Sequence, residues 1–240
     1  MMHVKSICRS CAMLVPALLA GAAIANAKVK AKADPQGSQS TIGQLDAASK
    51  NFKNVQANVQ FDQYTKVVND HDISSGTMFV ERQGSSESMG ASVTDTTSPS
   101  AAKVLNYGGG VLQVYSPAAK QVDIFKAGAN QAKYESFLTL GFGGSGMDLK
   151  ADWTINDMGP ESISGVPTEK LDLIAKDQSV KNLFSHVTIW VDLKRDVSLK
   201  QIFYQPNGDS RTALYTNIRL NGHVDKEPYK IDTKATKVSH

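Results

Sequence analysis

Hydrophobic and polar side chains alternate along most of the chain between residues 53 and 221. The clearest stretch is residues 186–221, where two runs of period-two alternation flank an Asn207-Gly208 turn. Asn-Gly between alternating runs is a strong signal for a tight hairpin. Repeating this pattern along the chain predicts roughly ten or eleven strands, most of them neighbours in sequence. We therefore expect a mainly β (α+β) protein built on an antiparallel sheet.

Two early strands show which side chains should share a face. In residues 55–68 small and apolar residues occupy alternate positions, with Gln, Asn and Asp between them. In residues 73–82 the same spacing places Arg82 on one face with Met78 and Val80. Because successive side chains of a strand point to opposite faces, one face of this sheet should be buried and the other wet.

Two segments depart from the strand period and predict short helices. Residues 41–51 begin with Thr41 and Gln44, which fit a capping box. Residues 131–140 place apolar side chains at helical spacing and end at Gly141. The glycine-rich run that follows, residues 141–149, predicts a flexible joint. The second helix is therefore expected to form a lid.

A sheet of this size has to twist and curl, and two or three helices are too few to cover it on both sides. The curl leaves a concave apolar surface, and small helices laid across it would close an open half-barrel over a hydrophobic cavity. The expected lining consists of residues that carry the apolar face, together with apolar residues of the lid. These are Val55, Val59, Phe61, Met78, Val80, Arg82, Val114, Phe137, Leu138 and Phe142.

The N-terminus has the pattern of a secretory signal peptide. Residues 1–27 contain Lys5 and Arg9, then a short apolar run, then Ala25-Asn26-Ala27, a small-x-small cleavage site. Both cysteines of the chain lie in this leader, so the exported protein would have no disulfide. We expect residues 28–39 to form a flexible lead and residues 40–240 a single domain.

Charge excludes one class of partner. The chain has 26 basic and 23 acidic residues, a net charge of +3, and the leader itself contributes basic residues only. A nearly balanced domain lacks the electrostatic footprint of a nucleic-acid-binding protein. No nucleic-acid partner is expected.

Motifs for catalysis or metal binding are weak. Residues 141–146 match GxGxxG by letters, but the dinucleotide fingerprint requires a preceding strand and a following helix. Ser145 lacks the glycine two positions later that a nucleophile elbow has, because Met147 stands there. The histidines after the leader are scattered, without HxH or HExxH. We expect no enzyme activity, no cofactor and no metal; an uncharacterised hydrolase is the enzyme alternative.

The sequence allows two interpretations of Arg82. A guanidinium that shares a face with apolar neighbours needs partners for its several donors if it is buried. It either reaches solvent at the end of its strand or donates to backbone carbonyls of the lid and so gates the cavity. The sequence leaves both open.

The order of elements resembles one known family, the LolA-type outer-membrane lipoprotein carriers with their LolB, RseB and LppX relatives. The resemblance runs through TMFVER, VLQVYSP, KQVDIF, FLTLGFG and the QIFYQPNGD hairpin. It implies an open barrel of about eleven antiparallel strands under a helical lid. It also implies a strand-ending arginine at the cavity mouth, which is Arg82 here, although Gln83 replaces the usual proline.

By this resemblance the protein is expected to be a monomeric periplasmic carrier that shuttles acylated lipoproteins, or a related lipid, between membranes. An inner-membrane donor complex and an outer-membrane acceptor would be its partners. The alternative within the family is a lipid- or lipoprotein-sensing regulator of the RseB kind. It would use the same cavity to sense a signal and would hold a stable protein partner.

Overall fold

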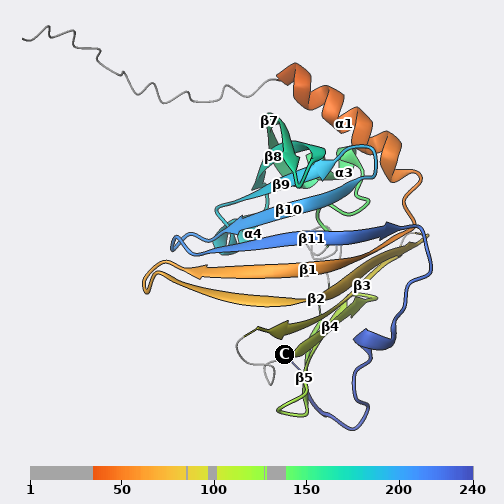
Figure 1. Ribbon diagram of the computed structural model, residues 1–240, viewed down its shortest axis with the longest axis vertical. Coiled ribbons are helices and arrows are strands. Elements are labelled where there is room, and N and C mark those ends of the chain that lie inside the picture. The colour runs from red at the N-terminus through yellow and green to blue at the C-terminus, as the bar shows by residue number, and fades with distance from the viewer. Residues whose placement is uncertain (1–34, 85, 97–101, 127, 129–138, 240) are drawn as a thin grey trace, which may run out of the picture. The chain divides into compact units, whose positions relative to one another are not determined.

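The computed structural model describes residues 35–239 except 85, 97–101, 127 and 129–138 (Figure 1). All described residues belong to one compact unit, Lys32–His240. The predicted signal peptide and most of the flexible lead fall outside them, and so do Phe137, Leu138 and nearly all of the predicted lid helix. Thr139 and Leu140, the last two residues predicted in that helix, form a turn.

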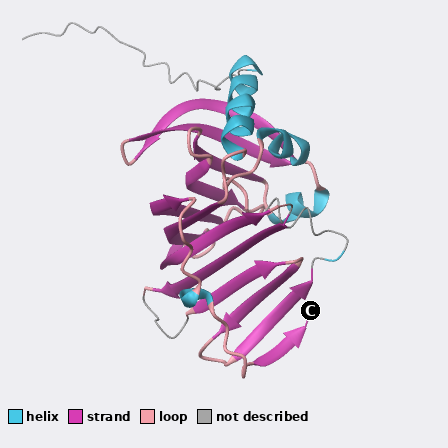
Figure 2. Ribbon diagram, turned by 90° about the vertical axis from the view of Figure 1, so that its right-hand side faces the viewer, coloured by secondary structure: helices cyan, strands magenta, loops and turns pink. Residues whose placement is uncertain are grey.

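One open sheet of twelve strands makes up most of the described chain, as the predicted half-barrel requires (Figure 2). Its spatial order is β12-β6-β5-β4-β3-β2-β1-β11-β10-β9-β8-β7. The strands are β1 (Asn54–Thr65), β2 (Asp70–Gln83), β3 (Ser86–Asp95), β4 (Lys103–Gly108), β5 (Val111–Ser116), β6 (Gln121–Lys126), β7 (Trp153–Ile163), β8 (Val166–Ala175), β9 (His186–Asp192), β10 (Val197–Tyr204), β11 (Ser210–Leu220) and β12 (Thr236–Ser239).

Antiparallel pairing holds for every described neighbour pair except β12 with β6, which is parallel. Because hairpins join consecutive strands, the order follows the sequence with two exceptions: β1 pairs with β11, and β12 closes one edge. The sequence predicts a last short strand near Tyr229 to Ile231, and this prediction is wrong. Residues Glu227–Tyr229 form η3, a 3-10 helix with proline at its start, and the final strand, β12, comes later.

The two faces of the sheet bury different sets of side chains. On the face that we call the inner face, alternate residues of β1 and β2 bury their side chains, with Val55 opposite Val80 and Ala57 opposite Met78. The opposite, outer face carries Phe79, which packs against Tyr229 of the C-terminal segment. The alternation read from the sequence is confirmed, but part of the outer face is buried as well.

Three described α-helices accompany the sheet: α1 (Pro35–Ser49), α3 (Gly146–Asp152) and α4 (Gln178–Leu183). Helix α1 packs against α3 and β7. It starts six residues earlier than predicted, inside the segment expected to be a flexible lead. The capping box was therefore wrong: Thr41 lies within the helix, and its hydroxyl donates to Asp157 Oδ2 at 2.8 Å.

Helix α3 begins inside the segment predicted to be a flexible joint, residues 141–149, and continues past its end. Ser145 caps it, accepting from the Asp148 amide at 3.0 Å and donating to the Asp148 carboxylate at 2.7 Å. Gly146 at its first position, and the glycines that precede its cap, hid the helix in the sequence, because glycine disfavours helices. None of the described helices is long and apolar enough to cross a membrane.

Candidate functional site

The inner face of β1–β3 and β11 forms a continuous apolar floor. Five of the ten residues predicted to line a cavity are buried in its cluster, among them Phe142 from the loop before α3. The ring of Phe142 meets that of Tyr215 edge to face, with centroids 4.9 Å apart. The five are Val55, Val59, Met78, Val80 and Phe142.

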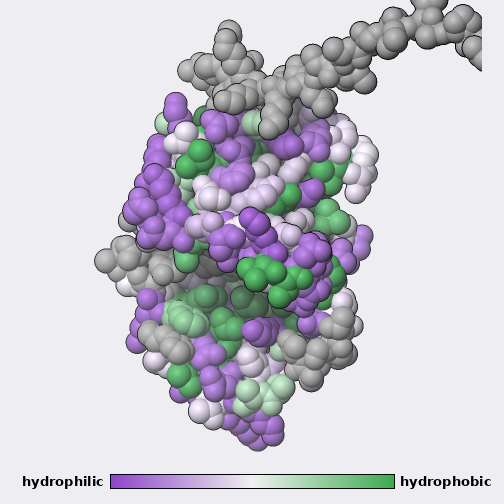
Figure 3. Space-filling view, turned by 90° about the vertical axis from the view of Figure 1, so that its left-hand side faces the viewer, coloured by the Kyte–Doolittle hydropathy of each residue, from purple (hydrophilic) through white to green (hydrophobic). Residues whose placement is uncertain are grey.

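Beyond this buried floor the inner face carries apolar side chains that are only partly covered. Phe61, Met89, Val93 and Leu105 are half-buried and pack against the cluster. Val114 lies opposite Leu105 in the β4–β5 ladder and so shares the inner face. In the space-filling view a hollow opens in the surface, and hydrophobic side chains gather inside it (Figure 3).

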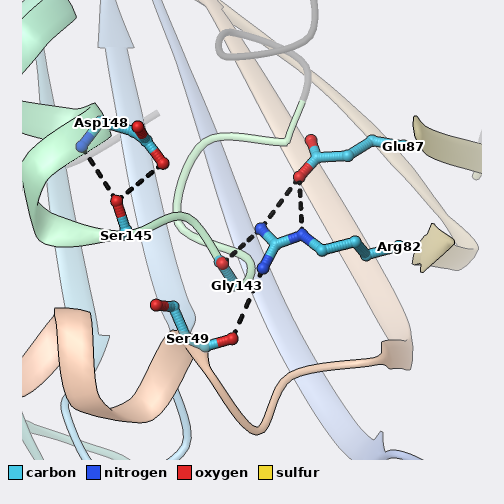
Figure 4. Close-up of polar contacts among 6 residues, drawn as sticks. All are labelled: Ser49, Arg82, Glu87, Gly143, Ser145 and Asp148. Carbon is cyan, nitrogen blue, oxygen red and sulfur yellow. Dashed lines mark hydrogen bonds and ion pairs between the residues drawn. The ribbon is translucent and has the colours of Figure 1, made fainter. Parts of the chain in front are cut away.

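Arg82 ends the apolar row of β2 and joins three segments of the chain (Figure 4). Its guanidinium donates to Glu87 Oε1 of β3 from Nη2 at 2.9 Å and from Nε at 3.2 Å. Nη2 also donates to the carbonyl of Gly143, and Nη1 to that of Ser49, the last residue of α1. We call Arg82 with Ser49, Glu87 and Gly143 the Arg82 junction.

The loop at residues 139–145, which reaches the Arg82 junction, is fixed by close backbone contacts. Gly143 donates its amide to Asp196 O at 2.9 Å, and Ser198 donates to Gly141 O at 2.7 Å. Gly143 has a φ of +73°, and a Cβ built there would lie 2.2 Å from the ring of Phe52. Only glycine fits this position without displacing the ring.

Phe52 completes the junction from the other side. The residue is 6% exposed, and the centroid of its ring lies 5.6 Å from the Arg82 guanidinium carbon, a cation–π distance. The positive charge therefore has an ion pair, two carbonyls and an aromatic face. Such a set satisfies a partly buried guanidinium.

Asp196 lies in the β9–β10 turn, against the same loop. The residue is 2% exposed, and its Oδ2 has no hydrogen-bond partner among the described residues. Burial raises the pKa of this carboxyl to about 7, opposed by the charge of Arg82 and assisted by that of Asp46. A proton is thus bound far more readily here than on an exposed aspartate.

A second carboxyl with a raised pKa lies where β8 meets β7. Burial is the main cause of the rise in the pKa of Glu169 to about 7, followed by its hydrogen bond to Asp157 and the charge of that residue. Asp157 also accepts from Thr41 of α1 and from the Gly159 amide. This pair connects α1 to the sheet.

The far end of the inner face carries another arginine. Arg211 lies opposite Gln63 in the β1–β11 ladder, on the same face as Ala213 and Phe61. Its guanidinium carbon is 4.2 Å from the centroid of the Phe61 ring. Arg211 is not among the residues predicted from the sequence to line the cavity, although its two-residue spacing from Ala213 places it on the apolar face.

The residues predicted to line the cavity do not all lie in one place in the structure. The structure brings together the five buried residues with Phe61 and places Arg82 at their border, whereas Val114 lies on the same face but several strands away from β1. Phe137 and Leu138 lie outside the described residues. Sequence reasoning missed Met89, Val93 and Leu105, because β3 and β4 alternate weakly.

No cluster of three metal-ligating side chains occurs within the described part of the chain.

Comparison with protein-family models gives no match, and comparison with curated proteins gives none either. Solved structures do match. An uncharacterised conserved protein from Thermus thermophilus has a TM-score of 0.53 at 10% identity, over 85% of this chain and 100% of that one. MucB has a TM-score of 0.50 at 10% identity, over 84% of this chain and 65% of MucB.

A LolA superfamily protein from Nitrosomonas europaea aligns with a TM-score of 0.37 at 15% identity, over 80% of this chain and 97% of that one. At such identities the comparisons concern the fold. The open half-barrel that the resemblance implies is confirmed, and this chain is similar in fold to MucB, which stands with the RseB-like structures.

Proposed function

We propose that this protein is an exported carrier that holds the acyl chains of a lipoprotein, or of a related lipid, against the inner face of its sheet. The single observation that carries the proposal is the apolar inner face, whose half-buried side chains include Phe61, Met89, Val93 and Leu105. The hollow in Figure 3 gives hydrocarbon a place to lie. The carrier would work in the periplasm, between an inner-membrane donor and an outer-membrane acceptor.

The physical need for such a carrier is large. An acyl chain in water costs about 0.8 kcal/mol for each exposed methylene. A lipid-modified protein therefore crosses an aqueous compartment only if an apolar surface encloses its chains. The inner face supplies that surface without covalent chemistry, so the proposed role is binding and transfer.

Release requires that enclosure be reversible. We propose that the Arg82 junction holds the cavity shut when it is empty, by joining α1 and the loop at residues 139–145 to the sheet. The hydrogen bonds from Arg82 to the carbonyls of Ser49 and Gly143 can break and form again, because no covalent bond joins these segments at the junction. The guanidinium stays paired with Glu87 when they break. A cavity closed by these hydrogen bonds has a movable cover, in contrast to a permanently sealed barrel.

The test is native mass spectrometry of the protein purified from its own periplasm, with the bound lipids extracted and identified. We expect masses above that of the polypeptide, which are removed by organic extraction and correspond to acylated molecules. Delipidated protein is the control and should regain the added mass when incubated with the extract. A polypeptide that carries no lipid and takes up none would contradict the proposal.

The regulator of the RseB kind is the second candidate, and the likeness of fold to MucB favours it over an enzyme. Such a protein would keep one protein partner bound through purification and would not hand lipid on. Size-exclusion chromatography of the material used for mass spectrometry separates the two roles. A stoichiometric protein complex without lipid transfer supports the regulator.

A further inference from the structure

A pocket lies at the Arg82 junction, between α1, α3 and the inner face of β9, with Arg82 and Glu87 in its wall. Its volume is about 350 Å³, within the range of small-molecule sites. Much of its wall is hydrocarbon from these elements and the loop before α3. The apolar lining residues are Leu45, Leu140, Leu149, Ile189 and Val191.

The polar part of the wall is predominantly acidic. Its carboxylates belong to Glu87, Asp148, Asp152 and Asp196, and Arg82 is the one cationic side chain among the described lining residues. The Arg82 charge is already paired with Glu87. The remaining carboxylates give the pocket a negative field, which low-dielectric walls concentrate.

Within this acidic wall, Asp196 is the residue that most needs a hydrogen-bond partner from a ligand. It lines the pocket, is only 2% exposed, and leaves Oδ2 without a hydrogen-bond partner among the described residues. Such groups are rare, because an unpaired buried carboxylate costs several kcal/mol. An incoming cationic donor would supply the missing partner.

We propose that this pocket binds a small amphiphilic amine, with its ammonium group directed to Asp196 and its hydrocarbon body against the apolar wall. Acidic and apolar surfaces meet in one cavity, which favours a protonated amine over an anion or a plain hydrocarbon. The proposal goes beyond acyl-chain binding and does not depend on it. The amine would lie in the pocket under α1 and α3. The acyl chains are proposed to lie in a different place, over β1–β5.

The test is isothermal titration calorimetry with n-hexylammonium, hexan-1-ol and hexanoate, which share one hydrocarbon body and differ in charge. At about pH 7.5 the amine is protonated. We expect hexylammonium to bind about tenfold more tightly than hexan-1-ol, and hexanoate to bind most weakly. Equal affinity for the amine and the alcohol would overturn the proposal.

Matched variants locate the site. Asp196→Asn keeps the shape of the side chain and should abolish the preference for the amine over the alcohol. Asp70→Asn removes an exposed carboxylate at the β1–β2 turn and should leave the preference intact. If Asp196→Asn retains the preference, the ammonium binds elsewhere and the assignment fails.

A measurement on the unaltered protein covers the case in which Asp196→Asn does not fold. The carboxyl carbon of Asp196 is followed by NMR through a pH titration, with and without hexylammonium. A bound ammonium should lower the pKa from about 7, and an unchanged pKa contradicts the proposal. The charged groups facing Asp196 from neighbouring elements, which stay the same in both titrations, are Asp46, Arg82, Glu87, Asp148 and Asp152.

Discussion

At the scale of single residues, Arg82 holds together parts of the chain that are far apart in sequence. Its side chain contacts β3 through Glu87, the end of α1 through Ser49, and the loop before α3 through Gly143. Side-chain periodicity places Arg82 at the border of the apolar face. The acceptors could not be predicted, because two of them are backbone carbonyls, which any residue type provides.

Arg82→Leu should fold and should retain bound lipid longer than the unaltered protein. Removing the donors to Ser49 and Gly143 destabilises the shut, empty state, which competes with the loaded state. The measurement is the rate at which a fluorescent fatty acid leaves the protein into acceptor vesicles. Arg219→Leu is the matched control, since Arg219 bonds to Gln56 and makes no contact with the junction. Equal release from both variants would remove Arg82 from the mechanism.

Asp196 makes stability depend on pH in a specified direction. Its pKa is raised from 3.8 to about 7 in the folded state, so the folded state binds the proton more tightly than the unfolded state. The resulting stabilisation is complete below about pH 4 and is lost as the pH rises through 7. Relative to Asp196→Asn, the free energy of unfolding should fall by roughly 1 to 4 kcal/mol between these limits.

Urea unfolding of both proteins across that pH range provides the measurement. Glu169 titrates in the same window but is present in both, so the difference between the two curves isolates Asp196. Parallel curves would show that the Asp196 carboxyl is not buried as described.

At the scale of elements, the loop at residues 139–145 and α3 differ most from expectation. A glycine-rich sequence predicts freedom, and here Gly141 and Gly143 instead allow close approach to Ser198 and Phe52. Sequence reasoning cannot separate these two uses of glycine, since both rest on the missing Cβ. The start of α1 was missed for a related reason: Pro35 and Gly37 normally indicate a loop, and proline is also favoured in the first turn of a helix.

Gly143→Ala should destabilise the protein by about 2 kcal/mol or more, because it combines a positive φ with a collision against Phe52. Gly144→Ala is the adjacent control: a Cβ there meets nothing within 4 Å, and its φ is not positive. Thermal unfolding followed by circular dichroism compares the two. Equal melting temperatures would contradict the close packing of this loop on Phe52.

At the scale of the whole molecule, the sheet and its inner face were readable from the sequence. Alternation over β1, β2 and β11 is strong, and the Asn207-Gly208 turn fixes one hairpin. The packing of the C-terminal segment on the outer face could not be predicted from the sequence. Val224 and Tyr229 look like residues of a polar tail, and only the structure brings them onto Phe79. The parallel pairing of β12 with β6 depends on the same long-range return of the chain.

The proposed carrier function depends on hydrocarbon binding to the inner face, and two neighbouring positions of β3 allow a direct test. Val93 lies on the inner face and packs against its cluster, whereas Thr94, opposite Ser75, points to the outer face. Val93→Glu places a charge where acyl chains are proposed to lie. Thr94→Glu adds the same charge to the opposite face and serves as its control.

The decisive measurement is the transfer of a fluorescent diacylglyceryl-modified peptide from donor to acceptor vesicles through water. The unaltered protein and Thr94→Glu should accelerate the transfer equally, and Val93→Glu should fall to the rate without protein. If Val93→Glu transfers the peptide as fast as Thr94→Glu does, the inner face is not the lipid-binding surface.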